Sequence, residues 1–297
     1  MVAGQVGKKK IRIIPRLDVK GNNLVKGVHL EGLRVIGRPE DYAKYYYETG
    51  ADEIIFMDSV ASLYGRNNLS NIVETVADQI FTPLTVGGGI RSIEDADLLF
   101  RSGADKVAIN TFLFKDDTLI PKIADKYGSQ SVVVSIDVTK TDAGKYQCLT
   151  DNGRERTNEE VFNWVEKIIQ LGAGEILLTQ VDLEGTGLGF DIELAKSVVN
   201  FSKVPVIICG GGGTKEHVLD LADYATPEGI AISSLFHYDA IRILNDPDKI
   251  TEGNTGFINQ IPKTGSLRKG IDPISIQLLK KYLTNNNIRI RYYDHNS

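Results

Sequence analysis

Two aspartates stand at the ends of apolar segments that are far apart in the chain. Asp18 ends the run IIPRLD and Asp137 ends the run VVVSID, 119 positions later. Burying a carboxylate is costly unless it is paired or put to use. Two facing carboxylates suit a general acid and a general base that act on opposite sides of one substrate. We therefore predict that Asp18 and Asp137 are catalytic, although one such aspartate alone would favour a loop cap.

Glycine clusters follow two other apolar segments. Gly87–Gly89 come after PLTV, and Gly210–Gly213 come after PVII and Cys209. Glycine lets backbone N–H groups approach an anion closely, because no side chain stands in the way. Short polar residues follow the next apolar segment in each case, namely Asn110 and Thr111 or Ser233 and Ser234. The pattern predicts two phosphate-binding sites and a ligand with a phosphate at each end.

Parallel strands separated by helices would bring all these residues to one edge. Helical patterns occur at 39–49, 68–79, 93–102, 158–171 and 191–201. A closed barrel of eight such strands carries its active site at their carboxyl ends. The apolar segments that we expect to form these strands are 11–17, 53–57, 83–86, 105–109, 131–137, 174–179, 205–208 and 229–232.

The chain also resembles itself, which favours a barrel over an open sheet. GADEIIFMD returns as GAGEILLTQ, PLTVGGGI as PVIICGGG and KVAINT as GIAISS, at offsets of 122 to 123 residues. We predict a (β/α)8 TIM barrel with two-fold pseudosymmetry that forms a single domain over 1–297. Its half-barrels are expected at about 11–125 and 131–240. An insertion at about 241–275 and a closing helix and strand at about 276–292 would follow.

Composition narrows the functional class. The net charge of −5 provides no basic field for nucleic acid or an anionic membrane. The two cysteines and four histidines show no metal-ligand spacing, and no dinucleotide fingerprint is present, so we expect neither a metal nor a cofactor. No long apolar run or secretory signal is found. We expect a cytoplasmic enzyme that acts on a phosphorylated small molecule.

The sequence resembles the cyclase subunit family of imidazole glycerol phosphate synthase, from histidine biosynthesis, over about 11–240. The resemblance implies that Asp18 and Asp137 are the catalytic acid and base, and that Lys26 lies on a flexible loop that closes over the substrate. It also implies phosphate binding by the residues predicted above and in the segment 179–185. The motifs that carry the resemblance are IIPRLDVK, ADEIIFMD, TVGGGI, GADKVAINT, GSQSVVVSID, GAGEILLT and the D-x-x-GT of 182–186. The phosphate-binding residues expected are Gly88, Gly89, Asn110 and Thr111 on one side, and Thr179, Glu184, Gly185, Gly210, Gly211, Ser233 and Ser234 on the other.

The resemblance further implies a partner. In that family a glutaminase subunit delivers ammonia at the N-terminal face of the barrel, through a ring of charged residues. The ring positions match Arg12, Glu53, Lys106 and Glu175, all at the starts of expected strands. Such a ring would also occur in a barrel merely for stability. We expect it here to be an ammonia gate next to a docked glutaminase.

Some residues depart from the family pattern. Arg16, where the family usually has cysteine, lies on the same strand face as Asp18, so it would pair with Asp18 or bind an additional anionic group. Leu183 and Gly187 replace an arginine and a lysine. These changes keep two alternatives open. One is a related ammonia-channelling barrel for amidination of a sugar in surface polysaccharide biosynthesis, with Arg16 as a specificity residue. The other is a non-catalytic barrel that binds a glutaminase.

Overall fold

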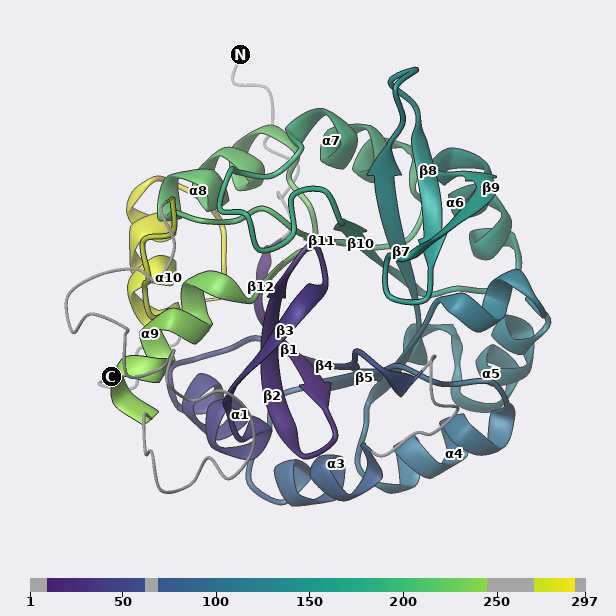
Figure 1. Ribbon diagram of the computed structural model, residues 1–297, viewed down its shortest axis with the longest axis horizontal. Coiled ribbons are helices and arrows are strands. Elements are labelled where there is room, and N and C mark those ends of the chain that lie inside the picture. The colour runs from purple at the N-terminus through teal and green to yellow at the C-terminus, as the bar shows by residue number, and fades with distance from the viewer. Residues whose placement is uncertain (1–9, 62–68, 245–269, 292–297) are drawn as a thin grey trace, which may run out of the picture.

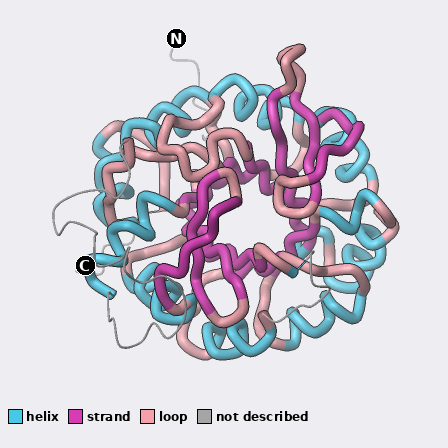
Figure 2. Tube along the Cα trace, in the orientation of Figure 1, coloured by secondary structure: helices cyan, strands magenta, loops and turns pink. Residues whose placement is uncertain are grey.

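The computed structural model describes residues 10–61, 69–244 and 270–291. Eight parallel strands form a closed barrel with helices around it, which confirms the predicted fold (Figure 1). Figure 2 shows the strands as an inner ring inside the ring of helices. The order β10-β11-β12-β1-β4-β5-β6-β7 closes through the pairing of β10 with β7. The barrel strands are β1 (Arg12–Lys20), β4 (Ile54–Asp58), β5 (Leu84–Gly87), β6 (Lys106–Ile109), β7 (Val132–Lys140), β10 (Glu175–Gln180), β11 (Val206–Cys209) and β12 (Gly229–Ile232).

Two β-hairpins that the sequence analysis did not predict extend from the barrel. In the first hairpin, β2 (Asn23–Val28) pairs antiparallel with β1 and β3 (Glu31–Gly37) pairs antiparallel with β2. In the second, β8 (Tyr146–Thr150) pairs antiparallel with β7 and β9 (Glu155–Glu160) pairs antiparallel with β8. The hairpins follow the first and fifth barrel strands, so they occupy pseudosymmetric positions. Their tips meet where Leu30 clusters with Leu149 and Val181.

The helix expected at 158–171 begins later than predicted. Residues 155–160 pair with β8, and α6 (Val161–Gln170) starts after them. Other helices begin at polar caps, as Ser92 and Thr214 show by accepting bonds from backbone N–H groups. The remaining helices are α1 (Pro39–Glu48), α3 (Ser70–Ala77), α4 (Ile93–Arg101), α5 (Leu119–Tyr127), α7 (Ile192–Phe201), α8 (Lys215–Tyr224), α9 (Ser234–Leu244) and α10 (Ile276–Asn285), with 3-10 turns at Thr111–Phe114 and Ser129–Ser131.

The region expected to be an insertion lies mostly outside the described residues, since 245–269 are not described; residues 241–244 belong to α9. The closing helix is α10, and of the closing strand one bridge from Ile290 to Ile11 is present. Lys280 of α10 pairs with Asp52 at 2.7 Å, where both side chains are buried. The C-terminal helix is thereby fixed to the amino-terminal end of β4. None of the described helices is both long and apolar enough to cross a bilayer.

Side chains that point into the barrel form layers. A middle layer is entirely apolar and fully buried. Inward-facing residues recur at every second position along a strand, so the inward side chains of each strand fall into successive layers. The apolar layer therefore lies between the charged residues at the strand starts and the polar residues at the strand ends. The members of this layer are Ile14, Ile55, Ala108, Val133, Leu177, Ile207 and Ala231.

Candidate active site

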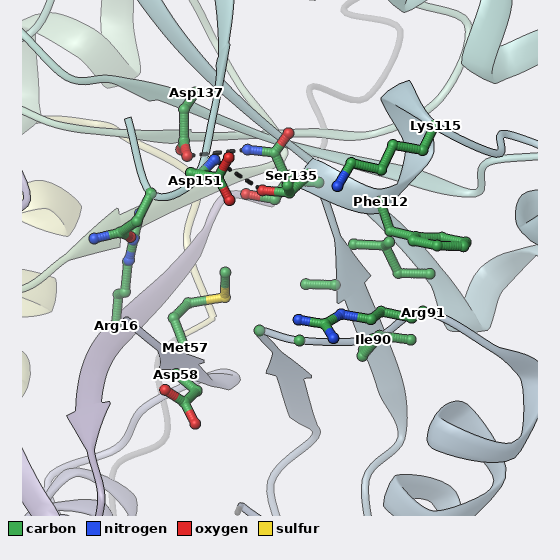
Figure 3. Close-up of a pocket in the computed structure, with 17 residues that line it drawn as sticks. Arg16, Met57, Asp58, Ile90, Arg91, Phe112, Lys115, Ser135, Asp137 and Asp151 are labelled. Atoms are coloured by element: carbon green, nitrogen blue, oxygen red, sulfur yellow. Dashed lines mark hydrogen bonds between the residues drawn. The ribbon is translucent and has the colours of Figure 1, made fainter. Parts of the chain in front are cut away.

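A cavity of about 520 Å³ opens at the carboxyl ends of the barrel strands. In Figure 3, Arg16 and Asp137 lie on one side of it, and Arg91 and Lys115 lie on the other. Six of the residues singled out from the sequence contribute to its wall. They are Arg16, Gly88, Gly89, Asn110, Thr111 and Asp137.

Asp137 is a buried carboxyl at the edge of this cavity. Burial raises its pKa to about 6, although the charge of Arg16 and a hydrogen bond from Asn110 act in the opposite direction. The Asn110 amide donates to Asp137 Oδ2 over 3.0 Å and so fixes the direction of the carboxyl group. A carboxyl group with such a pKa can both donate and accept a proton near neutral pH.

Asp18 has a different environment, because it is paired with a cation. Arg16 Nε donates to Asp18 Oδ1 over 3.0 Å, and both side chains are buried. Arg16 Nη1 also donates to Thr179 Oγ1 over 2.9 Å and approaches Cys209 Sγ at 3.6 Å. Asp18 does not appear in the described lining of the cavity, which it adjoins through Arg16. The expected pairing of Arg16 with Asp18 is therefore present.

The first glycine cluster forms one wall of the cavity. Gly88 has a φ of +104°, and a Cβ there would lie 2.6 Å from the carbonyl oxygen of Asp58, so only glycine fits. Asn110 and Thr111 come directly after β6, the next barrel strand. The Thr111 hydroxyl accepts a hydrogen bond from the Asp151 backbone amide at 2.9 Å. The open backbone and nearby cations make this wall suited to a phosphate.

Two cationic residues of this wall were not identified from the sequence. Arg91 and Lys115 are exposed residues that line the cavity. Each follows a barrel strand within a few residues, and this position relative to β5 and β6 was the available signal. Ser135 was also missed, although it precedes Asp137 by two residues and shares its strand face.

Lys26 does not lie on a loop, as the sequence analysis expected, but within strand β2. Its ammonium group donates to Glu184 Oε1 over 2.7 Å, and both side chains are buried. Burial disfavours a charged Glu184, but Lys26 and Arg16 outweigh it and lower the pKa of this carboxyl. The backbone amide of His29 also donates to the Glu184 carbonyl over 2.8 Å. These bonds hold the first hairpin against the loop after β10.

The second glycine cluster lies apart from the described lining of the cavity. Gly211 has a φ of +108°, and a Cβ there would collide with the Gly189 carbonyl. The Ser233 hydroxyl donates to the Arg16 carbonyl over 3.0 Å, and Ser234 begins helix α9. Those expected binding residues that do not contribute to the described cavity wall are Lys26, Thr179, Glu184, Gly185, Gly210, Gly211, Ser233 and Ser234.

At the opposite end of the barrel, four charged residues form a closed ring. Arg12 pairs with both Glu53 and Glu175. Lys106 pairs with the same two carboxylates, at 3.1 Å and 2.7 Å. The apolar layer separates this ring from the cavity. Within the described part of the chain, no group of three or more acidic, cysteine or histidine residues is arranged to hold a metal ion.

Comparison with known proteins agrees with this architecture. A family model described as "Histidine biosynthesis protein" matches residues 12–242. The imidazole glycerol phosphate synthase subunit HisF of Legionella pneumophila is 58% identical over 206 residues, covering 69% of this chain and 97% of that protein. The subunits of the same name from Streptococcus mutans and Bacillus cereus are 41% and 40% identical over 243 residues, or 82% of this chain and 97% and 96% of theirs.

The family model covers all eight barrel strands, both hairpins and both glycine clusters, and the relatives align over nearly their whole length. This chain therefore belongs to the family of histidine biosynthesis proteins.

Proposed function

We propose that this chain is the cyclase subunit of an imidazole glycerol phosphate synthase. In this reaction, ammonia and phosphoribulosyl formimino aminoimidazole carboxamide ribonucleotide give imidazole glycerol phosphate and aminoimidazole carboxamide ribonucleotide. The observation that carries the proposal is the pair of buried aspartates in unlike environments at the barrel mouth, above a charged ring and beside a glycine-lined cavity. The names of relatives that are 40–58% identical agree with it.

Asp137 is the residue best suited to transfer protons. Its pKa of about 6 leaves both protonation states accessible near neutral pH. Asp18 acts from the other side as a carboxylate held by Arg16. Two carboxyl groups in separate environments take separate roles, one moving protons and one holding charge.

One substrate phosphate binds where the cavity carries Gly88 and Gly89. Arg91 and Lys115 lie at that end and supply positive charge. A phosphate fixed there places the remainder of the ligand between Arg16 and Asp137, because these residues form the other side of the same cavity. The reacting carbon thus comes within reach of the proton-transferring carboxyl group.

Ammonia enters through the ring at the other end of the barrel. The ring of Arg12, Glu53, Lys106 and Glu175 serves as its gate, and the apolar layer above it favours neutral ammonia over ammonium, since burying an unpaired charge is costly. The route then opens at Arg16, Ser135 and Asp137, which line the cavity. The substrate and its nucleophile therefore reach the site from opposite ends.

A glutaminase subunit docks on the N-terminal face around the ring. Three exposed aromatic residues precede barrel strands at this end, namely Phe81 in the connection to β5, Phe201 at the end of α7 before β11, and Tyr224 at the end of α8 before β12. Phe81 is 86% exposed. Aromatic side chains are enriched at protein interfaces. A Phe81→Ser variant should lose glutamine-dependent activity with its partner while keeping its activity with ammonium salt; equal loss of both would contradict this docking face.

The proposal is tested by turnover of the ribulosyl substrate with ammonium salt in the absence of any partner. Wild type should form both products, while Asp18→Asn and Asp137→Asn should be strongly impaired yet folded. Leu188→Ser, at an exposed position outside the cavity lining, serves as a matched control and should behave as wild type. A folded wild type that forms no product would refute the proposal.

A second candidate function is supported by the second glycine cluster. Glu184 is already neutralised by Lys26 and Arg16 there, and Leu183 and Gly187 provide no charge. These features favour an acceptor with one phosphate-binding end, such as a sugar that is amidinated in surface polysaccharide biosynthesis. Turnover of such a sugar with ammonia, and none of the ribulosyl substrate, would select this function. A purely glutaminase-binding barrel would turn over neither.

A further inference from the structure

Arg16 is an unusual residue for the interior of a barrel. The side chain is 2% exposed, although it carries a positive charge, and it lies on β1 directly above the apolar layer. The pKa of its guanidinium is raised well above the usual value because Asp18 and other nearby acids outweigh the effect of burial. Arg16 is therefore a permanent cation at the point where the barrel interior meets the cavity.

The bonds of Arg16 leave one nitrogen available. Nε binds Asp18 and Nη1 binds Thr179 and Cys209, whereas Nη2 has no hydrogen-bond partner among the described residues. Arg16 nevertheless lines the cavity, on the side of Asp137. A buried guanidinium held at two nitrogens is rigid, so its remaining donor has a fixed position next to the space for the ligand.

We propose that Arg16 is a catalytic residue whose Nη2 donates a hydrogen bond to the oxygen of the acceptor carbonyl that ammonia attacks. The inference rests on the proposed function, because it assumes that ammonia emerges from the apolar layer. The carbon attacked then lies just above that layer, and both Arg16 and Asp137 face this space.

The step balances as an ordinary condensation. The ammonia nitrogen forms a bond to the carbonyl carbon, and the π electrons move to the oxygen, where the Arg16 cation stabilises the negative charge. Protons pass from nitrogen to oxygen, with protonated Asp137 as donor and its carboxylate as acceptor. The C–O bond then breaks, water leaves, and an imine remains. A preorganised donor at a developing oxyanion is typically worth a factor of about 10² to 10³ in kcat.

Kinetics of Arg16 variants with ammonium salt provide the first test. Arg16→Ala should lower kcat by about 10² to 10³-fold while changing KM for the acceptor by less than about tenfold. Added guanidinium ion at non-denaturing concentration should restore activity saturably, whereas urea, which has a similar shape and no charge, should not. Arg16→Lys, which keeps a charge beside Asp18, should also be slow, because the planar fork is lost. Unchanged kcat in a folded variant, or equal rescue by urea, would overturn the inference.

A binding test does not depend on the identity of the acceptor. In phosphate-saturated protein, formate serves as a small oxyanion probe and is followed by nuclear magnetic resonance titration. Wild type should bind it saturably, Arg16→Met should weaken binding by about tenfold or more, and Lys140→Met, at an exposed lysine outside the cavity lining, should retain it. Absence of binding in wild type, or full binding by Arg16→Met, would overturn the inference. Failure of turnover in wild type with formate binding intact would instead refute the proposed reaction alone.

Discussion

The two glycine clusters occupy equivalent places in the two half-barrels, yet they form unlike surroundings. Gly88 and Gly89 line an open cavity with two exposed cations. Gly210 and Gly211 are buried, and near them Lys26 and Glu184 neutralise each other. The pseudosymmetric backbone provides two similar sites. The surrounding side chains make the difference. The first cluster is open to the phosphate of a ligand, whereas the second already lies next to the carboxylate of Glu184.

The two aspartates also differ in their surroundings, as the two glycine clusters do. Asp137, beside the open cluster, is held by a neutral amide and has a pKa of about 6. Asp18, beside the closed cluster, is held by a guanidinium. Proton transfer is therefore assigned to Asp137, whereas the Asp18–Arg16 pair holds charge next to the same cavity.

The largest effect is expected on the open side. Asp137→Asn should lower kcat by about 10² to 10⁴-fold, because the residue that transfers protons is lost while the shape of the side chain is kept. Steady-state kinetics with ammonium salt measure this effect. An Asp137→Asn enzyme with wild-type kcat would show that the asymmetry between the aspartates has no catalytic meaning.

On the closed side the expected effect is on stability. Glu184→Gln leaves Lys26 buried without its counter-ion and should lower the free energy of unfolding by about 3–5 kcal/mol. The double variant Lys26→Met, Glu184→Gln removes both charges and should cost clearly less. Urea unfolding curves provide the values. If single and double variants were equally destabilised, the ion pair would not be what distinguishes this region.

The pH dependence of stability sharpens the contrast between the aspartates. The pKa of Asp137 is about 6 in the folded protein, whereas the ordinary value for an aspartate is 3.8, so the folded state binds the proton more tightly between these pH values. Its contribution to the free energy of unfolding therefore falls as pH rises from about 4 to about 6, by at most about 3 kcal/mol. Asp137→Asn should consequently be more stable than wild type at neutral pH, and this difference should vanish at about pH 4. A constant difference would contradict the raised pKa.

The smallest effect concerns the cation at the open cluster. Lys115→Ala should raise KM for the phosphorylated substrate about 10 to 100-fold, as expected for the loss of one charged hydrogen bond, and leave kcat largely unchanged. Lys140→Ala, at an exposed lysine at the end of β7 outside the cavity wall, provides the matched control. Equal effects of the two substitutions would indicate a general charge effect and not a phosphate site.

The sequence predicted the barrel because its signal is repeated. Eight apolar segments with an internal offset of about 120 residues specify the strands, and these segments agree with the observed strands near their starts. The hairpins were missed, although Gly21 and the turn Asp151–Gly153 adopt the positive φ angles that such residues favour. Their strands lack strict alternation, since β9 is polar throughout. Tertiary pairing with β8 formed this strand against its local preference.

Site residues that share a strand face could be predicted from their spacing of two positions. Contacts between residues far apart in the chain could not. Arg16 beside Asp18 follows from a spacing of two residues. The pairing of Lys26 with Glu184 joins positions 158 apart in the chain, and no local pattern indicates it. Arg91 and Lys115 lie in loops, where a cation is common and its direction is decided by the fold.

The most direct test of the central claim is transfer of labelled ammonia. Purified protein is incubated with nitrogen-15 ammonium salt and the ribulosyl substrate, and the products are analysed by mass spectrometry. The proposed cyclase activity predicts imidazole glycerol phosphate with one labelled nitrogen, together with unlabelled aminoimidazole carboxamide ribonucleotide, and neither product with Asp137→Asn. Unconverted substrate with a folded wild type, or a product without label, would contradict it.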